Sequence, residues 1–480
     1  MNIEKLKGAI QKTVAKTGVS HQSVYDMYFF EQFLFRLSIS KHKEKFVFKG
    51  GFLLENMLGV SARTTMDIDL KAMKIEMSDK KLMSVMKDIC KIDADDEIEY
   101  AVLGIEPITA ETKYNGKSVK IQAKLKNLKK TFGIDIAQGD IVTPYPQRYT
   151  YNSSIDDLSF ELFAYTKETI IAEKFETLVT KGLGNSRAKD LFDIYLLMND
   201  GVDADILYAA IINTFYKRET AFDLQSIHDM LQKIHTSKYR KELYEKYAKT
   251  HSFVKAVSFE DVMSAVYKIF DILHGKKIIL PNVDISISFI RHGEDEQDKV
   301  GGWSDNHLTA LGKEQIAAVA ETLDEEYDYI LSSDLIRTKE SAEIIGQNIS
   351  RPIVYIEGLR ETNNGTLKNL TKKEFIKGGY KHFTELGFEE NYQGGESPKQ
   401  FYERVQQTFC NILKEYNGKK ILIVSHGGVI TVIECLLKDY KYSNLLKIVP
   451  PHASKTEINI KNGKLLQIEP DTSMSVWKNK

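Results

Sequence analysis

The chain has 480 residues, which is more than one hydrophobic core commonly supports, so roughly two to four domains are expected. A hydrophobic fraction of 42% and a charged fraction of 28% are ordinary for a soluble globular protein. The net charge of −1 gives no global sign of a nucleic-acid or membrane binder.

The cysteine and apolar patterns indicate the cellular compartment of the protein. Cys90, Cys410 and Cys435 are widely separated and form no CxxC pair, so we expect neither a disulfide framework nor a zinc site. The N-terminal residues lack the apolar core of a signal peptide, and no apolar run approaches the ~20 residues that span a bilayer. These patterns predict a cytoplasmic protein with no membrane attachment.

The first half begins with helical periodicity over residues 1–45, where an aromatic stripe from Tyr25 to Phe35 is expected to face the core. Short strands are predicted at 46–48, 67–73, 118–125 and 132–137. From about 155 to 278 the pattern becomes helical. A lysine-rich run at 116–130 is either a solvated strand face or a contact for an anionic partner.

Residues 46–70, FVFKGGFLLENMLGVSARTTMDIDL, carry a glycine pair and two aspartates with one residue between them. Because Asp67 and Asp69 lie in a short strand, both carboxylates point to the same side and can hold Mg²⁺. Gly50 and Gly51 allow the backbone to approach phosphates closely. Asp135 lies on a later strand and is a candidate third carboxylate of a two-metal site.

This order of motifs resembles the nucleotidyltransferase superfamily with a DNA polymerase β-like fold. The stretches KETIIAEKFETLVTKG (167–182) and NSRAKDLFDIYLL (185–197) further resemble the AbiEii/AbiGii abortive-infection toxins, over about residues 20–200. The resemblance implies that Lys174 and Asp190 join the active site. It also implies Mg²⁺ or Mn²⁺ and an NTP as cofactors, tRNA ends or a protein hydroxyl as acceptors, and a cognate antitoxin as a possible partner.

Two of these residues also have ordinary structural interpretations. Lys174 could neutralise the triphosphate or be an exposed helix residue. Asp190 could orient that lysine or activate an acceptor hydroxyl, or it could form a surface salt bridge with Arg187 or Lys189. Arg63 is a further candidate phosphate contact.

A break over 273–284, LHGKKIILPNVD, separates the two halves, and the boundary is predicted near residue 280. The first domain then comprises residues 1–280, with a helical extension over about 201–278. Residues 281–480 form the second domain. After the break, strands alternate with helices, which is typical of an α/β domain with a mixed or parallel sheet.

The second domain carries an ordered set of phosphate-handling residues. Arg291 and His292 directly follow the strand ISISFI, and His426 follows the strand ILIVS, where α/β folds place ligands. A nucleophilic histidine needs cations around the phosphoryl oxygens, which Arg291 and Arg337 can supply bidentately. Glu361 is the candidate proton donor to the leaving oxygen.

Together with DNHLTALGKEQ (305–315) and GGESPKQFYERV (394–405), this set resembles the histidine phosphatase superfamily over about residues 285–460. Cofactor-dependent phosphoglycerate mutase belongs to the same superfamily. The resemblance implies a three-layer α/β domain that needs no cofactor. Hydrolysis is the commoner outcome in this superfamily, so a phosphatase is favoured over a mutase.

The two sets together predict a bifunctional enzyme of a toxin–antitoxin or phage-defence type. It would transfer a nucleotidyl group from an NTP and hydrolyse a phosphorylated substrate through a phosphohistidine. One alternative is a nucleotidyltransferase that is gated by a phosphate-sensing second domain. Another is a nucleotidyltransferase that acts on small molecules.

Overall fold

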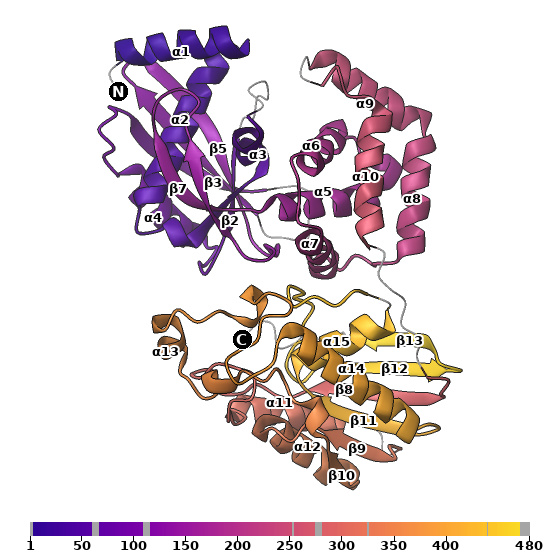
Figure 1. Ribbon diagram of the computed structural model, residues 1–480. Helices are drawn as coiled ribbons and strands as arrows, with labels where there is room; N and C mark the ends of the chain where they lie inside the picture. The colour runs from indigo at the N-terminus through magenta and orange to yellow at the C-terminus, as the bar shows by residue number, and fades with distance from the viewer. Residues whose placement is uncertain are drawn as a thin grey trace. The chain divides into compact units, whose positions relative to one another are not determined.

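The computed structural model describes residues 3–59, 67–108, 116–251, 254–273, 281–323, 326–438 and 440–470. The chain divides into two compact units, Met1–Leu273 and His274–Lys480, each with its own β-sheet (Figure 1). Each unit is therefore described by itself. No helix among the described residues combines the length and the apolar character that crossing a membrane requires.

The first unit contains a seven-stranded mixed sheet with the order β3-β4-β5-β2-β1-β7-β6. Strand β2 runs parallel to β5 and antiparallel to β1, and β1 runs parallel to β7. The strands are β1 (Phe46–Lys49), β2 (Asp67–Ala72), β3 (Glu99–Pro107), β4 (Lys117–Leu125), β5 (Leu128–Ala137), β6 (Gln147–Asn152) and β7 (Ser159–Ala164).

Four helices accompany this sheet and six follow it as a helical region (Figure 1). Helix α5 packs against α6 and α7, and α10 packs against α6. The first four are α1 (Ile3–Thr17), α2 (His21–Ile39), α3 (Gly50–Leu58) and α4 (Asp79–Cys90). The other six are α5 (Lys167–Lys181), α6 (Ala188–Asn199), α7 (Ala204–Lys217), α8 (Leu224–Thr236), α9 (Lys238–Thr250) and α10 (Phe259–Leu273).

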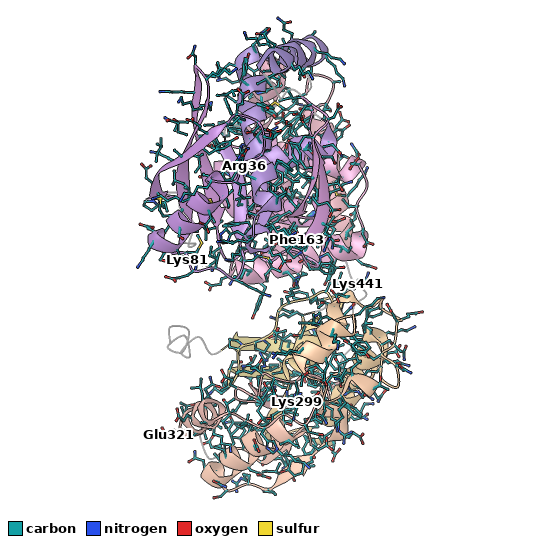
Figure 2. All side chains as sticks on the ribbon, turned by 90° about the vertical axis from the view of Figure 1, so that its left-hand side faces the viewer. Arg36, Lys81, Phe163, Lys299, Glu321 and Lys441 are labelled. Atoms are coloured by element: carbon teal, nitrogen blue, oxygen red, sulfur yellow. The ribbon has the colours of Figure 1, made fainter. Side chains whose placement is uncertain are left out.

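The aromatic stripe of the first half forms the core under α2, as predicted. The ring of Phe30 is fully buried and lies 5.5 Å from the ring of Phe52 and 4.8 Å from that of Phe132. Such contacts join α2 to α3 and to β5. Arg36 on the same helix, inside the first unit in Figure 2, is also buried and donates to Asp96 at 2.6 Å.

The predicted strands are present, and the helical character of residues 1–45 is confirmed by α1 and α2. Ser20 begins α2 by accepting a hydrogen bond from the Ser23 N–H. One helical prediction needs correction. The stretch from 155 was predicted to be helical, yet it begins with β7, in which Phe160, Leu162 and Ala164 are buried alternately. That period-two pattern is the strand signal that the helical assignment overlooked.

The lysine-rich run is a strand face, as one of the two interpretations predicted. It covers β4 and the first three residues of β5, and its lysines pair with acids on neighbouring segments. Lys120 contacts Glu106 of β3 at 2.6 Å, Lys124 contacts Glu99 at 3.2 Å, and Lys117 pairs with Asp79. These positive charges therefore have acidic partners within the first unit.

The second unit is a three-layer α/β structure around a six-stranded sheet with the order β10-β9-β11-β8-β12-β13. The first four of these strands are parallel, and β12 and β13 are antiparallel. The strands are β8 (Ile285–Arg291), β9 (Tyr329–Ser332), β10 (Ile353–Tyr355), β11 (Lys420–Ser425), β12 (Lys455–Lys461) and β13 (Lys464–Pro470).

Helices cover both faces of this sheet (Figure 1). Alternate residues of the central strands face opposite layers: Ile290 packs with α11 and α12, whereas the ring of Phe289 lies 6.2 Å from that of Phe409 on α14. Helix α14 in turn packs against α15. The helices are α11 (Ala310–Glu321), α12 (Ile336–Ile349), α13 (Lys372–Lys377), α14 (Pro398–Glu415) and α15 (Gly427–Leu437).

Candidate active sites

Three predicted carboxylates meet on one face of the first sheet. In β2, Ile68 and Leu70 are buried, so Asp67 and Asp69 lie on the opposite face. The parallel pairing of β2 with β5 sets Asp69 directly opposite Asp135. Strand pairing thus brings together side chains that are far apart in the sequence.

The electrostatics of this group favour a cation. Burial, together with the charges of Asp135 and Asp67, raises the pKa of Asp69 to about 6 against the lowering effect of Lys49. Burial and the charge of Asp135 also raise the pKa of Asp67. Carboxylates that repel one another in this way are stabilised in their charged form by a divalent ion.

Gly50 shows why this position carries no side chain. Its φ is +78°, in the left-handed region, and a Cβ built there would lie 1.9 Å from the Oδ2 atom of Asp69. The backbone at the start of α3 therefore lies directly against the Asp69 carboxylate. Gly51 is the second residue of the same helix. Arg63, the further candidate, lies outside the described residues.

Lys174 and Asp190 form one buried ion cluster. The Nζ atom of Lys174 lies 2.8 Å from Asp190 and 2.9 Å from Asp193, which joins α5 to α6. Asp190 is 4% exposed, so it is not the surface partner of Arg187 or Lys189. Burial would lower the pKa of Lys174, yet Asp193 and Asp190 together raise it and keep the lysine charged. Asp193 was not predicted, although the spacing KDLFD places it one turn after Asp190.

A second charged network beside the aspartates was also missed. Lys49 lies opposite Asp69 in the β1–β2 register, and its Nζ atom is 3.4 Å from both Asp140 and Glu173. Arg218 of the α7 C-terminus reaches the same two acids at 3.4 and 3.6 Å. Burial favours a neutral Lys49, but Glu173, Tyr165 and Asp140 together hold the pKa of Lys49 well above its usual range. Glu173 immediately precedes the predicted Lys174, so its position next to a candidate residue was visible in the sequence.

In the second unit, the ends of parallel strands gather the predicted residues. Arg291 ends β8, and His292 follows it. His426 follows β11, which pairs with β8 between Ser425 and Arg291. The rings of His292 and His426 consequently lie 5.3 Å apart. Ser333, which follows β9, contacts the Nε2 atom of His426 at 2.9 Å.

The protonation of His292 follows from its hydrogen bond. Its Nδ1 atom lies 2.7 Å from the carbonyl oxygen of Gly293. A carbonyl can only accept, so Nδ1 carries the proton and Nε2 keeps the lone pair. Burial, and then the charges of Arg337 and Arg291, hold the pKa of His292 well below its usual range. The imidazole is therefore neutral and able to act as a nucleophile.

The two arginines are held by backbone carbonyls. Arg291 donates to the carbonyl oxygen of Pro450 at 2.6 Å and to the Nε2 atom of His452 at 2.8 Å. Arg337 donates to the carbonyl oxygens of Gly302 and Ser304 at 2.8 and 3.2 Å. These contacts orient the guanidinium groups around His292.

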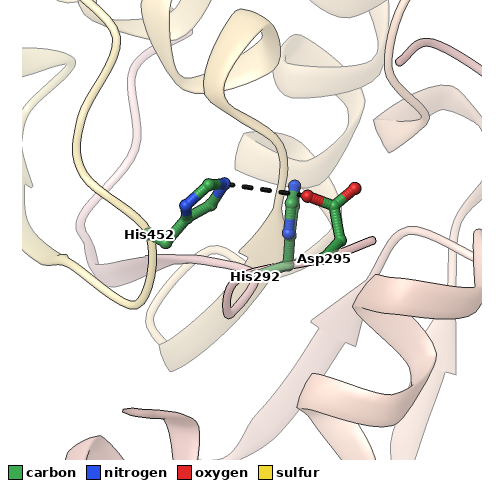
Figure 3. A group of neighbouring side chains, drawn as sticks. All are labelled: His292, Asp295 and His452. Carbon is green, nitrogen blue, oxygen red and sulfur yellow. Dashed lines mark ion pairs between the residues drawn. The ribbon is translucent and has the colours of Figure 1, made fainter. Parts of the chain in front are cut away.

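Asp295 and His452, which were not predicted, complete the pocket (Figure 3). Asp295 lies 3.7 Å from the Nε atom of Arg337 and 3.9 Å from His452. The ring of His452 lies 5.3 Å from that of His292, and burial together with Arg291 lowers the pKa of His452 to about 4. Asp295 stands next to the RHGE motif, so its position was visible, but its partner His452 is far away in the chain.

The described residues contain one group of three side chains that could together ligate a metal ion, with donor atoms that all lie within 4.8 Å of one another. This group is His292, Asp295 and His452. Two arginines adjoin this group, and the lone pair of His452 Nε2 already accepts from Arg291. Positive charge on both sides disfavours a dication and favours an anion such as phosphate. Asp67, Asp69 and Asp135 do not form such a compact group among the described residues.

Glu361 lies at the edge of the phosphate pocket. Its Oε2 atom accepts a hydrogen bond from the Gly428 N–H at 3.1 Å, and its backbone carbonyl accepts from Trp303 Nε1 at 2.6 Å. A Cβ on Gly428 would lie 2.4 Å from the Glu361 carboxylate, so the α15 start must be glycine there. Arg404 donates to the same carbonyl at 3.1 Å and fixes the loop.

Two family models match this chain. The model described as "Nucleotidyl transferase AbiEii toxin, Type IV TA system" matches residues 32–265. The model described as "Histidine phosphatase superfamily (branch 1)" matches residues 287–468. The two predicted resemblances and the predicted fold class are thereby confirmed.

Individual relatives match the second unit. "Probable phosphoglycerate mutase GpmB" of Salmonella choleraesuis (strain SC-B67) is 33% identical over 152 residues, which are 30% of this chain and 70% of that protein. Two solved structures are also similar. The alpha-ribazole phosphatase from Shigella flexneri has 24% identity and a TM-score of 0.35, over 38% of this chain and 93% of that one. Bacillus stearothermophilus YhfR has 26% identity and a TM-score of 0.36, over 39% of this chain and 96% of that one.

Proposed function

We propose that this chain performs a different phosphate reaction in each of its two units. The chain belongs to the histidine phosphatase superfamily through residues 287–468 and carries an AbiEii nucleotidyltransferase domain over residues 32–265. The second unit hydrolyses phosphomonoesters, and the first transfers nucleotidyl groups. The observation that carries the proposal is the neutral, Nδ1-protonated His292 beside the guanidinium groups of Arg291 and Arg337.

The hydrolysis proceeds in two steps. The Nε2 atom of His292 attacks phosphorus, the bond from phosphorus to the leaving oxygen breaks, and Glu361 donates a proton to that oxygen. Water then attacks the phosphohistidine, Glu361 takes the proton of that water, and inorganic phosphate leaves. Arg291, Arg337 and His426 surround the phosphoryl oxygens and stabilise their charge in both steps.

Hydrolysis of p-nitrophenyl phosphate tests this function. The His292→Ala variant should lose about 10³-fold or more in kcat, because no other group forms the covalent intermediate. His307→Ala is the matched control, since His307 is an exposed histidine that contacts Glu340. Activity that persists in His292→Ala, or conversion of 3-phosphoglycerate to 2-phosphoglycerate without phosphate release, would contradict the proposed hydrolysis.

In the first unit, Asp67, Asp69 and Asp135 are the residues that would hold Mg²⁺ or Mn²⁺. Their clustering and the raised pKa of Asp69 fit such an ion. The ion would neutralise charge on the triphosphate of a bound NTP. Gly50 lets the backbone lie directly against the Asp69 carboxylate that would hold the ion, and Lys174 remains charged beside Asp190 to bind the triphosphate.

The acceptor that we propose is an RNA end, such as that of tRNA, or a protein hydroxyl, and a cognate antitoxin is the expected partner. The test supplies each α-labelled NTP, with Mg²⁺, bacterial RNA and protein extract, to a His292→Ala protein that cannot remove its product. Label should reach one acceptor, and Asp67→Ala should abolish it. No transfer of any NTP would contradict an active transferase under these conditions.

A further inference from the structure

A cavity of about 340 Å³ opens beside the phosphate pocket of the second unit. Arg291, Glu361, Gly427 and Gly428 line it on the side of the reacting centre. Because Glu361 is the proposed proton donor to the leaving oxygen, this cavity lies where the leaving alcohol must be. The side chains that line the cavity therefore indicate the chemical class of the leaving alcohol.

The walls of this cavity are mainly apolar and aromatic. Most of them come from two connections, one between β10 and α14 and the other between α15 and β12, and Val300 comes from the connection between β8 and α11. The apolar side chains are Val300, Leu367, Phe375, Phe383, Tyr392, Tyr442, Leu446 and Val449. Across the described part of this lining, Arg291 is the one arginine and no lysine is present.

The walls are ordered by contacts of their own. Asn444 donates to the backbone carbonyls of Phe383 and Leu386 at 2.7 and 3.0 Å, which ties the two connections together. The ring of Tyr442 stacks on that of Tyr402 at 5.2 Å, at an interplanar angle of 11°. A wall that is preformed in this way binds a bulky group without first ordering itself.

We propose that this cavity binds the alcohol part of the substrate, and that this part is a bulky apolar or aromatic group. The inference rests on the proposed phosphatase function and adds the substrate class to it. Burying such a group against these walls is favourable, roughly in proportion to the apolar area removed from water. The carboxylate of a small polyanion such as 3-phosphoglycerate would instead be desolvated against walls that hold no lysine and no arginine besides Arg291.

Two alkyl phosphates of matched reactivity test the substrate class. Both n-hexyl phosphate and 3-phosphoglycerate have a primary alkyl ester, so their chemical step is similar and the leaving groups differ in polarity. We expect kcat/KM for n-hexyl phosphate to exceed that for 3-phosphoglycerate by about tenfold or more. Hydrolysis of p-nitrophenyl phosphate by the same preparation reports separately on the phosphatase function.

Two variants locate the preference in the cavity. Phe383→Ala removes a half-buried wall residue and should reduce the preference for n-hexyl phosphate several-fold. Phe388→Ala is its matched control, because Phe388 contacts Tyr442 at a ring distance of 6.4 Å but does not line the cavity. Val449→Lys, at a 40% exposed position of the lining, adds a cation and should shift the preference towards 3-phosphoglycerate.

The outcomes are distinguishable. A hydrolase that is active on p-nitrophenyl phosphate but equally or more efficient with 3-phosphoglycerate would overturn the substrate class and leave the phosphatase intact. Equal effects of Phe383→Ala and Phe388→Ala would also overturn it. Absence of hydrolysis with all three esters would overturn the proposed function itself.

Discussion

The carboxylate of Asp295 occupies an unusual position for a residue of a phosphate pocket. It is 8% exposed and lies between Arg337 and His452, while Asn306 donates to its Oδ2 atom at 3.3 Å. A bound phosphate dianion would be repelled by this charge and would compete with it for Arg337. Asp295 therefore opposes the binding of highly charged phosphoryl groups.

Removing this charge should tighten binding of phosphate-like anions. For Asp295→Asn we expect the inhibition constant of orthovanadate to fall by about three- to tenfold, because one repulsive charge is lost while the side-chain shape is kept. Asp305→Asn is the control, since Asp305 pairs with Lys368 at the surface. Weaker inhibition in Asp295→Asn would mean instead that Asp295 acts by positioning Arg337.

At the scale of elements, the junction of β1 with α3 shapes the backbone beside the Asp69 carboxylate. The chain turns into the helix at Gly50 with φ +78°, directly against Asp69. Any larger residue would meet both a strained backbone and the carboxylate.

Gly50→Ala should therefore abolish nucleotidyl transfer and destabilise the first unit by about 1–3 kcal/mol, through backbone strain and displacement of Asp69. Labelled transfer and the thermal unfolding midpoint are the measurements. Gly8→Ala is the control, because a Cβ at Gly8 in α1 meets nothing within 4 Å. A Gly50→Ala protein with normal transfer would show that the close approach is dispensable.

Helix α2 contributes a buried acid that makes stability depend on pH. Glu31 is 0% exposed and accepts hydrogen bonds from Ser153 Oγ at 2.7 Å, Tyr151 OH at 3.1 Å and the Ser154 N–H at 3.2 Å. Burial nevertheless raises the pKa of Glu31 from 4.5 to about 7. The folded chain thus keeps a proton that the unfolded chain loses, and its free energy of unfolding falls as pH rises from about 4.5 to about 7.

The Glu31→Gln variant lacks this titration, so its Tm relative to the wild type should be higher at pH 8 than at pH 5. Each kcal/mol of difference in the free energy of unfolding should change the Tm difference between the two proteins by about 2–4 °C. Glu4→Gln, at an exposed position of α1, should show no such change with pH. A Tm difference for Glu31→Gln that is independent of pH would contradict the raised pKa.

At the scale of the whole molecule, each unit has its own sheet, core and set of charged residues. The predicted phosphate-handling residues of the second unit all come from within that unit. Covalent linkage keeps the two sites at a high effective concentration for any shared substrate.

A fragment of residues 281–480 should consequently fold alone and hydrolyse p-nitrophenyl phosphate with kcat/KM within about twofold of the full chain. Circular dichroism establishes whether the fragment is folded before activity is compared. A folded but inactive fragment would show that residues 1–280 contribute to the phosphatase site.

Local patterns in the sequence predicted the two families and the strands that carry the candidate residues, and they indicated the candidate residues next to strand ends. These features depend on neighbours in the chain: the alternation around Asp67 and Asp69, and the strand that precedes Arg291 and His292. The same local reasoning failed for β7, because a short alternating segment precedes a much stronger helical pattern.

Only the tertiary structure decided which distant side chains share an environment. The approach of His452 to His292, the position of Lys49 opposite Asp69 and the aromatic lining beside Glu361 all join segments that the sequence separates widely. Burial and the charges of such neighbours determine whether an imidazole or a carboxyl holds its proton. The sequence alone therefore determined the type of chemistry, whereas the tertiary structure decided the protonation, the partners and the shape of the substrate cavity.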